Sequence, residues 1–485
     1  MKLGIWLGFP NYTPMKREGI SRYVLYLVKH LVKNFKVQIE IWTCEINKNE
    51  CDYLFEDLLA DTEYSKYISI LTEKNYLEKY YNNKISIFKY SYMINSTKNT
   101  PSWKWPYRIY FHYCKISCSK KINILDYFAA AILLIKGIID KILFKLIPIN
   151  SKVNCNNSED EILVKSANFV SNVDCFVIPV FLLSNGLKLK KKKIISLHDL
   201  HVYEFLDLFV EEWGEENTKN WQYAFDSSIT TISNHILNEK IYFISNCDYV
   251  RKNHTLKYIQ NVKEELTDFV YLPVIIPDTI KKRIIKENIL RDKYKIVNDY
   301  IFFPTQVRPY KNLITLVKAL KIVIDKGFSI QVVLTGKLEN SKIASKYVEK
   351  NNLRRYIIET GDVSEEELYS LHKYSAATVV TSLFEGGFPW PALEGLFMDT
   401  PVIVPKIPVV IERLQSVGFN LHNCGLRIFE PLDYNKLANE IIYTLKNREK
   451  VITKQKPIKD VLLSYTWDDV AKKYYEIIQN KVLKS

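Results

Sequence analysis

Two cations stand close together at the start of a predicted helix. Arg308 and Lys311 belong to the run Arg-Pro-Tyr-Lys-Asn, which follows a strand-like segment and opens a helix-like one. The first turn of a helix leaves backbone N–H groups unpaired and carries the positive end of the helix dipole. Both features converge at the carboxyl edge of a predicted sheet, so the pattern predicts a site for an anion such as phosphate. The alternative is a solvated turn with incidental basic residues.

Two glutamates flank a loop that is rich in glycine, proline and aromatic residues. Glu385 lies in this loop, and Glu394 lies about one turn into a helix that begins near Pro391, a favourable position for proline. Gly386 and Gly387 allow the backbone to approach a ligand closely. Two carboxylates in this arrangement can hydrogen-bond a polyhydroxylated ligand. The alternative is an acidic turn followed by a glutamate near a helix start.

The elements that must position these residues alternate between strand and helix. We expect strands at 300–304, 330–335, 356–358, 377–380 and 401–404, and helices at 312–326, 365–373 and 391–398. Regular alternation of this kind is typical of a doubly wound parallel sheet. In such a sheet, ligands bind beyond the carboxyl ends of the strands.

The first part of the chain shows the same alternation with a less regular middle. A strand at 2–8 and a glycine-containing loop precede an amphipathic helix, and further strands are expected at 37–42, 175–179, 194–197, 240–245 and 269–272. Pro273 and Pro277, followed by the charged stretch 281–299, predict a domain boundary. A chain of 485 residues is too long for one ordinary core. We therefore expect domains at 1–275 and 276–464 and a terminal helix at 465–485 that packs back on the first domain.

Both motifs resemble those of the family-4 glycosyltransferases (glycosyl transferases group 1), which are retaining enzymes of the GT-B fold. The resemblance is nearly continuous over 300–475 and includes 332–336, 361–368, 400–404, Glu412, 425–433 and Trp467. Earlier in the chain it is confined to a glycine loop at 19–22 and to His198-Asp199, which is similar to the active-site histidine segment of the family. Residues 45–165 match no segment of the family and are interpreted as a divergent insertion. The resemblance implies an α/β chain with two Rossmann-like doubly wound domains facing a cleft.

The resemblance also implies roles for the charged residues. Arg308 and Lys311 would hold the donor diphosphate and stabilise the charge that grows on it as it leaves, assisted by N–H groups near Gly19. Glu385 would position the donor sugar, and Glu394 would bind the ribose hydroxyls.

The remaining implied roles concern one histidine and several positions of the donor site. His198 would hydrogen-bond the sugar or the reacting region, although a buried strand-end histidine with a structural hydrogen bond is the alternative. The implied catalytic set is therefore His198, Arg308, Lys311 and Glu385. The implied donor-binding set is completed by Gly19, Gly336, Gly361, Val363, Gly386, Gly387 and Phe388.

Two positions depart from the family pattern. Eight residues separate Glu385 from Glu394, where seven are usual, and Gly386-Gly387 is the expected place of the extra one. We expect the loop to absorb it and the activity to survive, which leaves the task of Glu385 open. Asp399 occupies a position where glycine is common, so the loop there is expected to be reshaped.

The implied function is transfer of a hexose-type sugar from a nucleotide diphosphate donor to a glycan or lipid-linked acceptor. The expected setting is bacterial surface polysaccharide or lipopolysaccharide synthesis. The chain contains no Asp-x-Asp sequence that would supply acidic ligands to a divalent metal. We therefore expect no metal and no cofactor. The resemblance implies retention of configuration at the anomeric carbon.

Composition is compatible with these expectations. The net charge of +14 fits either a solvated basic surface or attraction to an anionic membrane, and no nucleic-acid-binding module is apparent. The segment 124–149 has its charges on one half of a helical wheel, so it is either an interfacial membrane helix or, our preference, a core helix. The eight scattered cysteines are interpreted as reduced thiols. The first nine residues are too short for a secretory signal, so the expected location is cytoplasmic, with peripheral contact at the inner membrane face left open.

Two other functions are compatible with parts of the pattern. One is a nucleotide-sugar epimerase on the same fold, which would convert its substrate without an acceptor. The other is a non-catalytic, basic, membrane-associated binding protein that uses the 124–149 face. It would not be stabilised against heat by any nucleotide diphosphate, because a ligand of the native state must raise stability.

Overall fold

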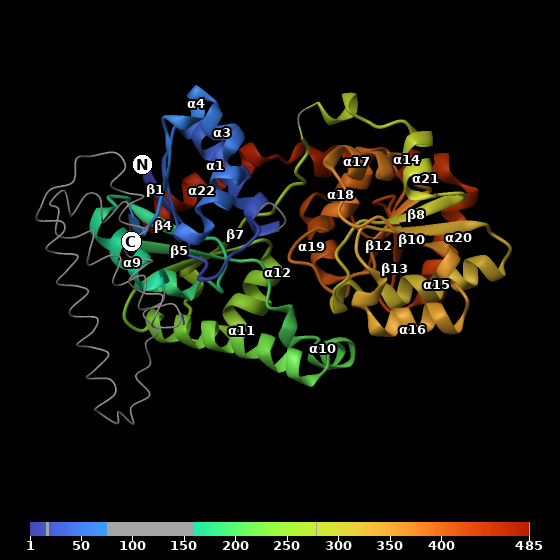
Figure 1. Cartoon of the computed structure of the whole chain (residues 1–485), viewed down its shortest axis with the longest axis horizontal. Coiled ribbons are helices and arrows are strands. Elements are labelled where there is room, and N and C mark those ends of the chain that lie inside the picture. Colours follow the sequence, from blue (N-terminus) through green and yellow to red (C-terminus); the bar gives the residue numbers. More distant parts are fainter. Residues whose placement is uncertain (16–18, 75–158, 278, 485) are drawn as a thin grey trace, which may run out of the picture.

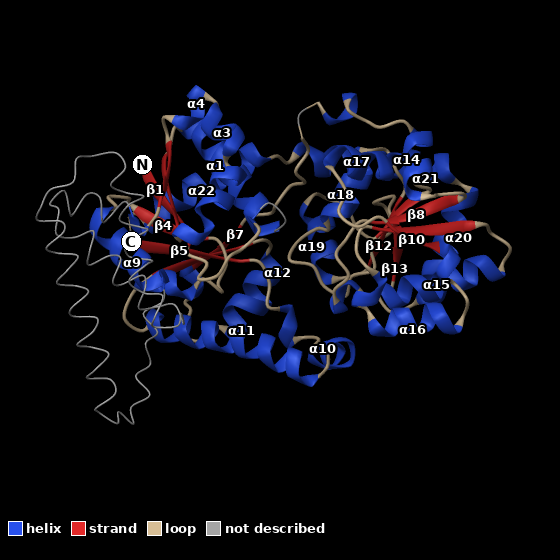
Figure 2. Cartoon of the chain, viewed as in Figure 1, coloured by secondary structure: helices blue, strands red, loops and turns tan. Residues whose placement is uncertain are grey.

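Two parallel sheets, one early and one late in the chain, organise the structure (Figure 1). The computed structural model describes residues 1–15, 19–74, 159–277 and 279–484. The first sheet has seven strands in the order β3-β2-β1-β4-β5-β6-β7, and the second has six in the order β10-β9-β8-β11-β12-β13. Helices surround both sheets (Figure 2). The expected pair of doubly wound, Rossmann-like α/β units is therefore confirmed, and they are called the first half (β1–β7) and the second half (β8–β13) below.

The first half follows the predicted alternation. Its strands are β1 Lys2–Leu7, β2 Gln38–Thr43, β3 Ile68–Leu71, β4 Cys175–Ile178, β5 Lys192–Leu197, β6 Ile241–Ser245 and β7 Thr267–Phe269. Its helices are α1 Gly19–Phe35, α2 Lys48–Leu54, α3 Glu56–Ala60, α4 Thr62–Ser65, α9 Glu159–Val170, α10 Leu206–Trp213 and α11 Glu215–Ile236. A further helical stretch begins with α12 Asp248–Val250, continues as a π-helix over Arg251–Thr255 and ends with α13 Leu256–Tyr258. The central strands are buried because helices cover both faces of the sheet.

Two expectations for the first half are corrected. The strand predicted at 269–272 lies instead at Thr267–Phe269, because β6 ends at Ser245, opposite Phe269, and offers later residues no partner. The predicted insertion at 45–165 is too wide, since α2, α3, α4 and the edge strand β3 all precede residue 75 and β3 pairs with β2. The segment 124–149 lies outside the described residues.

The second half matches the predicted elements within one residue at each end. Its strands are β8 Asp299–Phe303, β9 Ile330–Leu334, β10 Ile357–Glu359, β11 Ala377–Val379, β12 Val402–Pro405 and β13 Arg427–Phe429. Its helices are α14 Glu287–Tyr294, α15 Leu313–Asp325, α16 Lys342–Lys350, α17 Glu365–Tyr374, α18 Trp390–Phe397, α19 Pro408–Ser416, α20 Tyr434–Lys446 and α21 Arg448–Ser464. The charged stretch 281–299 is not a linker throughout, because α14 packs against α17 and buries Leu290.

The last helix, α22 Trp467–Ile477, returns to the first half and packs on α1 (Figure 1). The Tyr474 hydroxyl lies 2.6 Å from the Tyr23 hydroxyl, and His30 Nδ1 lies 2.6 Å from Asp468 Oδ1. The chain thus crosses between the halves twice, once after β7 and once before α22.

Strand order fixes where a ligand can bind. In the second sheet, β8 is flanked by β9 and β11, so the chain leaves β8 and β11 towards opposite faces. A crevice forms at such a switch point, beyond the carboxyl ends of the two strands. The loops that follow β8 and β11 carry the two motifs identified from sequence.

Candidate active site

A buried ion pair joins the two motifs at the switch point. Lys311 Nζ lies 2.5 Å from Glu385 Oε1, and both side chains are largely buried. The Ser382 hydroxyl donates to the same carboxylate oxygen at 2.5 Å. Burial alone would lower the pKa of Lys311, but the Glu385 carboxylate outweighs it and the pKa is raised. The amine therefore stays charged at the place where the sequence predicts an anion.

Asn312 holds the β8 loop against its neighbours. Its backbone is left-handed, with φ of 54°, a conformation that asparagine tolerates better than most residues. Its side-chain amide donates to the carbonyls of Thr381 at 3.2 Å and Pro431 at 3.0 Å. These bonds tie the start of α15 to the end of β11, which fixes Lys311 opposite Glu385.

Arg308 has different partners from Lys311. Its guanidinium donates to Gln306 Oε1 at 2.9 Å and lines a pocket of about 670 Å³. Gly336 and Gly361 line the same pocket, so the structure brings three of the predicted donor-binding residues together there. Val363 does not line it and packs near Tyr300 and Phe302 instead.

Glu394 faces the interior of the second half. Its side chain is 6% exposed, and Oε2 lies 3.3 Å from Nε2 of the buried His372 on α17. The other ring nitrogen of His372 lies 2.8 Å from the Thr378 hydroxyl. Glu394 is not among the residues that line the 670 Å³ pocket, and its contact with ribose hydroxyls stays a prediction.

His198 uses both ring nitrogens in the first half. Nε2 lies 2.8 Å from the Pro179 carbonyl, and Nδ1 lies 2.9 Å from the Asn246 side-chain amide. Burial lowers the pKa of His198, so the ring is neutral and carries one proton. A carbonyl can only accept, which places that proton on Nε2. Asn246 Oδ1 faces Nδ1 in this structure, so a hydrogen bond to the unprotonated Nδ1 requires the amide to be turned with its nitrogen towards the ring. His198 therefore makes the structural hydrogen bonds that were named as the alternative to a catalytic role. Its contact with a sugar stays a prediction.

The extra residue of the Glu385 loop lies where the two halves meet. A side chain at Gly386 would place Cβ 2.6 Å from the His198 carbonyl oxygen, a distance that real atoms do not reach. Gly387 has more room, with Asn246 Cβ at 3.9 Å as the nearest atom. Phe388 is buried in the core that spans both halves. Gly19 is exposed, and a Cβ added there would meet no atom within 4 Å, so its contact with a donor stays a prediction.

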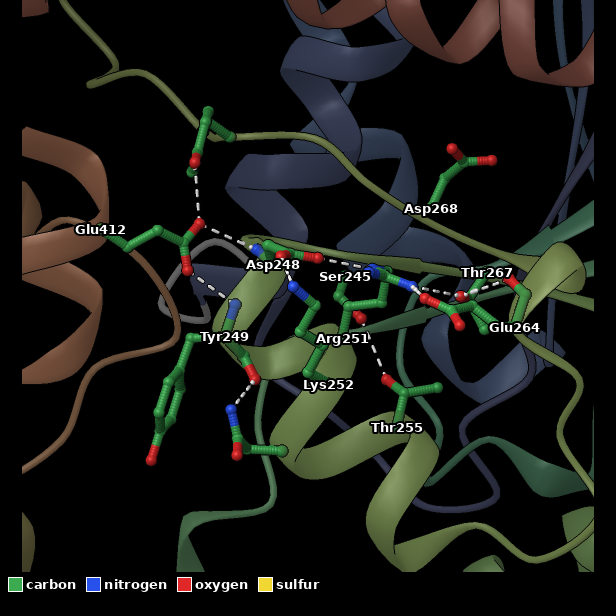
Figure 3. Close-up of polar contacts among 12 residues, drawn as sticks. Ser245, Asp248, Tyr249, Arg251, Lys252, Thr255, Glu264, Thr267, Asp268 and Glu412 are labelled. Atoms are coloured by element: carbon green, nitrogen blue, oxygen red, sulfur yellow. Dashed lines mark hydrogen bonds and ion pairs between the residues drawn. The ribbon is translucent and has the colours of Figure 1, made fainter. Parts of the chain in front are cut away.

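Glu412 makes a contact between the halves that sequence reasoning did not assign. Its carboxylate accepts the backbone N–H groups of Asp248 at 2.9 Å and Tyr249 at 2.6 Å, at the first turn of the helical stretch 248–258 (Figure 3). It also accepts the Tyr271 hydroxyl at 2.7 Å. Asp248 in turn pairs with Arg251. A carboxylate is favoured at a helix N-terminus because it complements unpaired N–H groups and the helix dipole.

In a second contact between the halves, the carboxylate belongs to the first half and its partner to the second half. Glu212, at the end of α10 in the first half, is buried and accepts the Ser341 hydroxyl of the second half at 2.6 Å. Ser341 is the N-cap of α16 and accepts the Ala344 N–H at 3.1 Å. Figure 1 shows α10 next to α16, and the two helices are in contact. No local pattern marks Glu212, because its partner is 129 residues away.

His201 was also missed from the sequence. It hydrogen-bonds Asp199, and its ring centroid lies 4.2 Å from that of Tyr310 and 6.1 Å from that of Phe384. The Asp199 pKa is lowered: burial would raise it, but the neighbouring His201 outweighs burial. His201 therefore connects the first half to both motif loops, through Tyr310 beside Lys311 and through Phe384 beside Glu385.

Other expectations concern metals, membranes and cysteines. Within residues 1–15, 19–74, 159–277 and 279–484, no cluster of three or more His, Cys, Asp or Glu side chains is placed to hold a metal ion. In the same ranges no helix is long and apolar enough to cross a membrane. The cysteines at positions 44, 51, 175, 247 and 424 are buried and form no disulfide with one another among the described residues.

Comparison with known proteins gives one family match and one curated relative. Residues 284–458 match the family profile of the glycosyl transferases group 1. A lipopolysaccharide 1,2-N-acetylglucosaminetransferase of Salmonella typhimurium is 22% identical over 204 residues, which cover 39% of this chain and 51% of that protein. The chain thus spans about half the length of the curated relative it matches.

Solved structures with the same fold cover the whole chain. Anabaena HepE in complex with UDP and glucose is similar with a TM-score of 0.59, at 12% identity and with 99% of each chain covered. Sucrose-phosphate synthase from Thermosynechococcus elongatus has a TM-score of 0.58 at 14% identity, with 100% of both chains covered. At these identities the similarity establishes the fold.

Proposed function

Because residues 284–458 form a glycosyl transferases group 1 domain in a chain of the GT-B fold, we propose that this protein is a glycosyltransferase. It moves a hexose-type sugar from a nucleotide diphosphate donor to a glycan or lipid-linked acceptor, with retention and without a metal. The first half, residues 1–275, binds the acceptor, and the second, residues 276–464, binds the donor. The likeness to a lipopolysaccharide N-acetylglucosaminetransferase supports a role in surface polysaccharide synthesis.

The observation that carries this proposal is the Lys311–Glu385 pair at the switch point between β8 and β11. Lys311 is held charged and largely buried beside the first turn of α15, where a diphosphate would gain from both the amine and the helix N-terminus. Glu385 already orients the amine, so little rearrangement is needed when a phosphate arrives. A charge placed in advance at the point where negative charge develops lowers the barrier to departure of the diphosphate.

Arg308 supplies the second positive charge from the wall of the adjoining pocket. The two cations together neutralise a leaving diphosphate, which is the work that a bound metal performs in other enzymes. Glu385 has two successive partners in this proposal, Lys311 in the free enzyme and the donor sugar in the complex. His198 contacts the sugar only after its bond to Asn246 or to the Pro179 carbonyl is broken.

Turnover of nucleotide sugars tests the proposal. The purified chain is supplied with UDP-glucose and UDP-N-acetylglucosamine, with and without a glycan or lipid-linked acceptor, and release of UDP is measured. We expect Lys311→Ala to lower kcat by about 10²–10³-fold, the range seen when one group that stabilises a developing anion is removed. Arg308→Ala should raise KM for the donor and lower kcat as well.

Lys321→Ala is the matched control, because Lys321 lies on α15 and pairs only with Asp325 at the surface among the contacts the structure describes. It should leave turnover unchanged. If Lys311→Ala and Arg308→Ala also leave turnover unchanged, the site assignment is wrong. Conversion of the nucleotide sugar without any acceptor would instead identify an epimerase.

A further inference from the structure

The 670 Å³ pocket has walls from both halves of the molecule. Gln306, Arg308, Gly336 and Gly361 line it from the loops that follow β8, β9 and β10, at the carboxyl edge of the second sheet. Trp213 and Asn217 line it from the first half. Its volume lies in the range of sites for small organic ligands. One wall of the pocket therefore belongs to the second half, which is proposed to bind the donor, and the facing wall belongs to the first half.

The facing wall is formed where α10 ends and α11 begins. Gly214 separates the two helices with φ of 86° and ψ of 162°, a region of backbone conformation that only glycine occupies readily. The chain can turn sharply there, directly after Trp213. The indole of Trp213 packs edge-on against Phe209, with centroids 5.0 Å apart, and remains partly exposed to the pocket.

Trp213 is held in place by contacts of α10 with the second half. Glu212 accepts the Ser341 hydroxyl at the start of α16, and the Phe209 ring stacks near the Tyr310 ring at 6.4 Å. Tyr310 is adjacent to Lys311 in the chain. The position of the indole is thus coupled directly to the loop that carries the two cations.

We propose that Trp213 stacks on the nucleobase of the donor and closes the nucleotide site from the first half. This proposal rests on the proposed function and adds to it a residue outside the family-matched region 284–458. A partly exposed indole offers a flat apolar surface, and every nucleobase has a complementary aromatic face. The diphosphate end of the donor then lies towards Arg308 and Lys311, and the base lies between Trp213 and the backbone near Gly336 and Gly361.

Binding of nucleotides to single variants tests the proposal. Titration of UDP, GDP and ADP into the full chain is followed by tryptophan fluorescence and by calorimetry. Trp213→Ala should weaken binding of the preferred nucleotide by about 5- to 150-fold, the range for loss of one base–aromatic stack. In turnover it should raise KM for the donor while kcat is largely kept, and Trp213→Phe should restore most of the affinity.

Two controls separate stacking from a structural effect. Trp221→Ala removes a neighbouring indole of α11 that does not line the pocket, and it should leave binding unchanged. Inorganic pyrophosphate has no base, so Trp213→Ala should not alter its binding.

Each outcome decides between the two proposals. If Trp213→Ala weakens pyrophosphate as much as the nucleotide, or if it leaves nucleotide binding unchanged, the stacking role is wrong while the proposed function stands. If no nucleotide binds the unmodified chain, the proposed function fails as well.

Discussion

Replacement of Glu412 by glutamine should weaken the contact between the two halves of the molecule. The Glu412 carboxylate accepts three hydrogen bonds, with Oε1 bound to Asp248 N and the Tyr271 hydroxyl and Oε2 bound to Tyr249 N. Burial, reinforced by Glu412, raises the pKa of Tyr271, so its phenol stays protonated and remains a donor. A glutamine has the same shape, but its NH₂ group cannot accept, and at least one donor must lose its partner.

The size of the effect follows from these contacts. Leaving one buried donor unsatisfied costs about 1–3 kcal/mol, and the three donors here are partly buried. Loss of the negative charge at a helix N-terminus costs about 0.3–1 kcal/mol more. The two effects overlap because they concern the same N–H groups, so we expect about 2 kcal/mol in total, or about a 30-fold shift from the closed towards the open arrangement.

Amide hydrogen exchange measures this shift at the groups concerned. In the parent chain, hydrogen bonds to the Glu412 carboxylate protect the amides of Asp248 and Tyr249 from exchange with solvent. Each amide must break its hydrogen bond before it can exchange. In Glu412→Gln, peptides that cover these residues should exchange up to about 30-fold faster under conditions where reclosing is much faster than chemical exchange, because the exchange rate then follows the opening equilibrium. A Tyr271→Phe variant removes one bond of the three and should show a smaller increase.

Glu264→Gln is the control for this measurement. Glu264 pairs with Arg251 on the same helical stretch, lies entirely within the first half and is 70% exposed. An exposed ion pair of this kind contributes little to stability, so amide hydrogen exchange at Asp248 and Tyr249 should not change in Glu264→Gln. Equal protection of these two amides in Glu412→Gln and in the parent chain would refute the view that the carboxylate holds the halves together.

Two further predictions concern the remaining contacts between distant segments. Gly386→Ala should lower donor turnover and thermal stability, because its Cβ would lie 2.6 Å from the His198 carbonyl, whereas Gly387→Ala should be tolerated; equal behaviour of the two variants would contradict this. For Asp468, burial would raise the pKa, but the bond to His30 leads the contributions that lower it to about 2. Its stabilising effect is therefore complete above its unfolded pKa of about 3.9 and is lost as the pH falls towards 2, so Asp468→Asn should flatten the fall in thermal midpoint over that interval.

Sequence patterns located the strands β8 to β12 because these are short buried runs, whereas β13 and the helices α14, α16, α19, α20 and α21 were not among the predicted elements. Ile330–Leu334, for example, is buried throughout, and a fully covered parallel strand has this continuous apolar character. The segment between β2 and β3 was not predictable in the same way. Its helices span only four to seven residues, too few for a helical period to become visible, and β3 is partly exposed.

The site was predictable where topology brings distant loops together. Lys311 and Glu385 are 74 residues apart, but each follows one of two adjacent strands whose carboxyl ends meet at one edge. The sequence therefore indicated that they would converge, although it could not indicate that they pair with each other. The orientation of Glu394 was not predictable from the sequence, because a glutamate on the first turns of α18 can face either the crevice or α17. Only the position of His372 decides that it faces α17.

The contacts between the halves could not be predicted from the sequence. They have the same physical basis, which is a carboxylate placed at the N-terminus of a helix in the other half. Glu212 of the first half binds at the N-terminus of α16, and Glu412 of the second half binds at the N-terminus of the 248–258 stretch, so each half supplies a carboxylate to a helix of the other. Their partners are 129 and 164 residues away, far beyond any local pattern. Separating the halves would break both contacts at once and leave unpaired N–H groups at two helix starts. The arrangement of the two halves is therefore stabilised by one carboxylate from each half, and any motion that separates them must break both contacts.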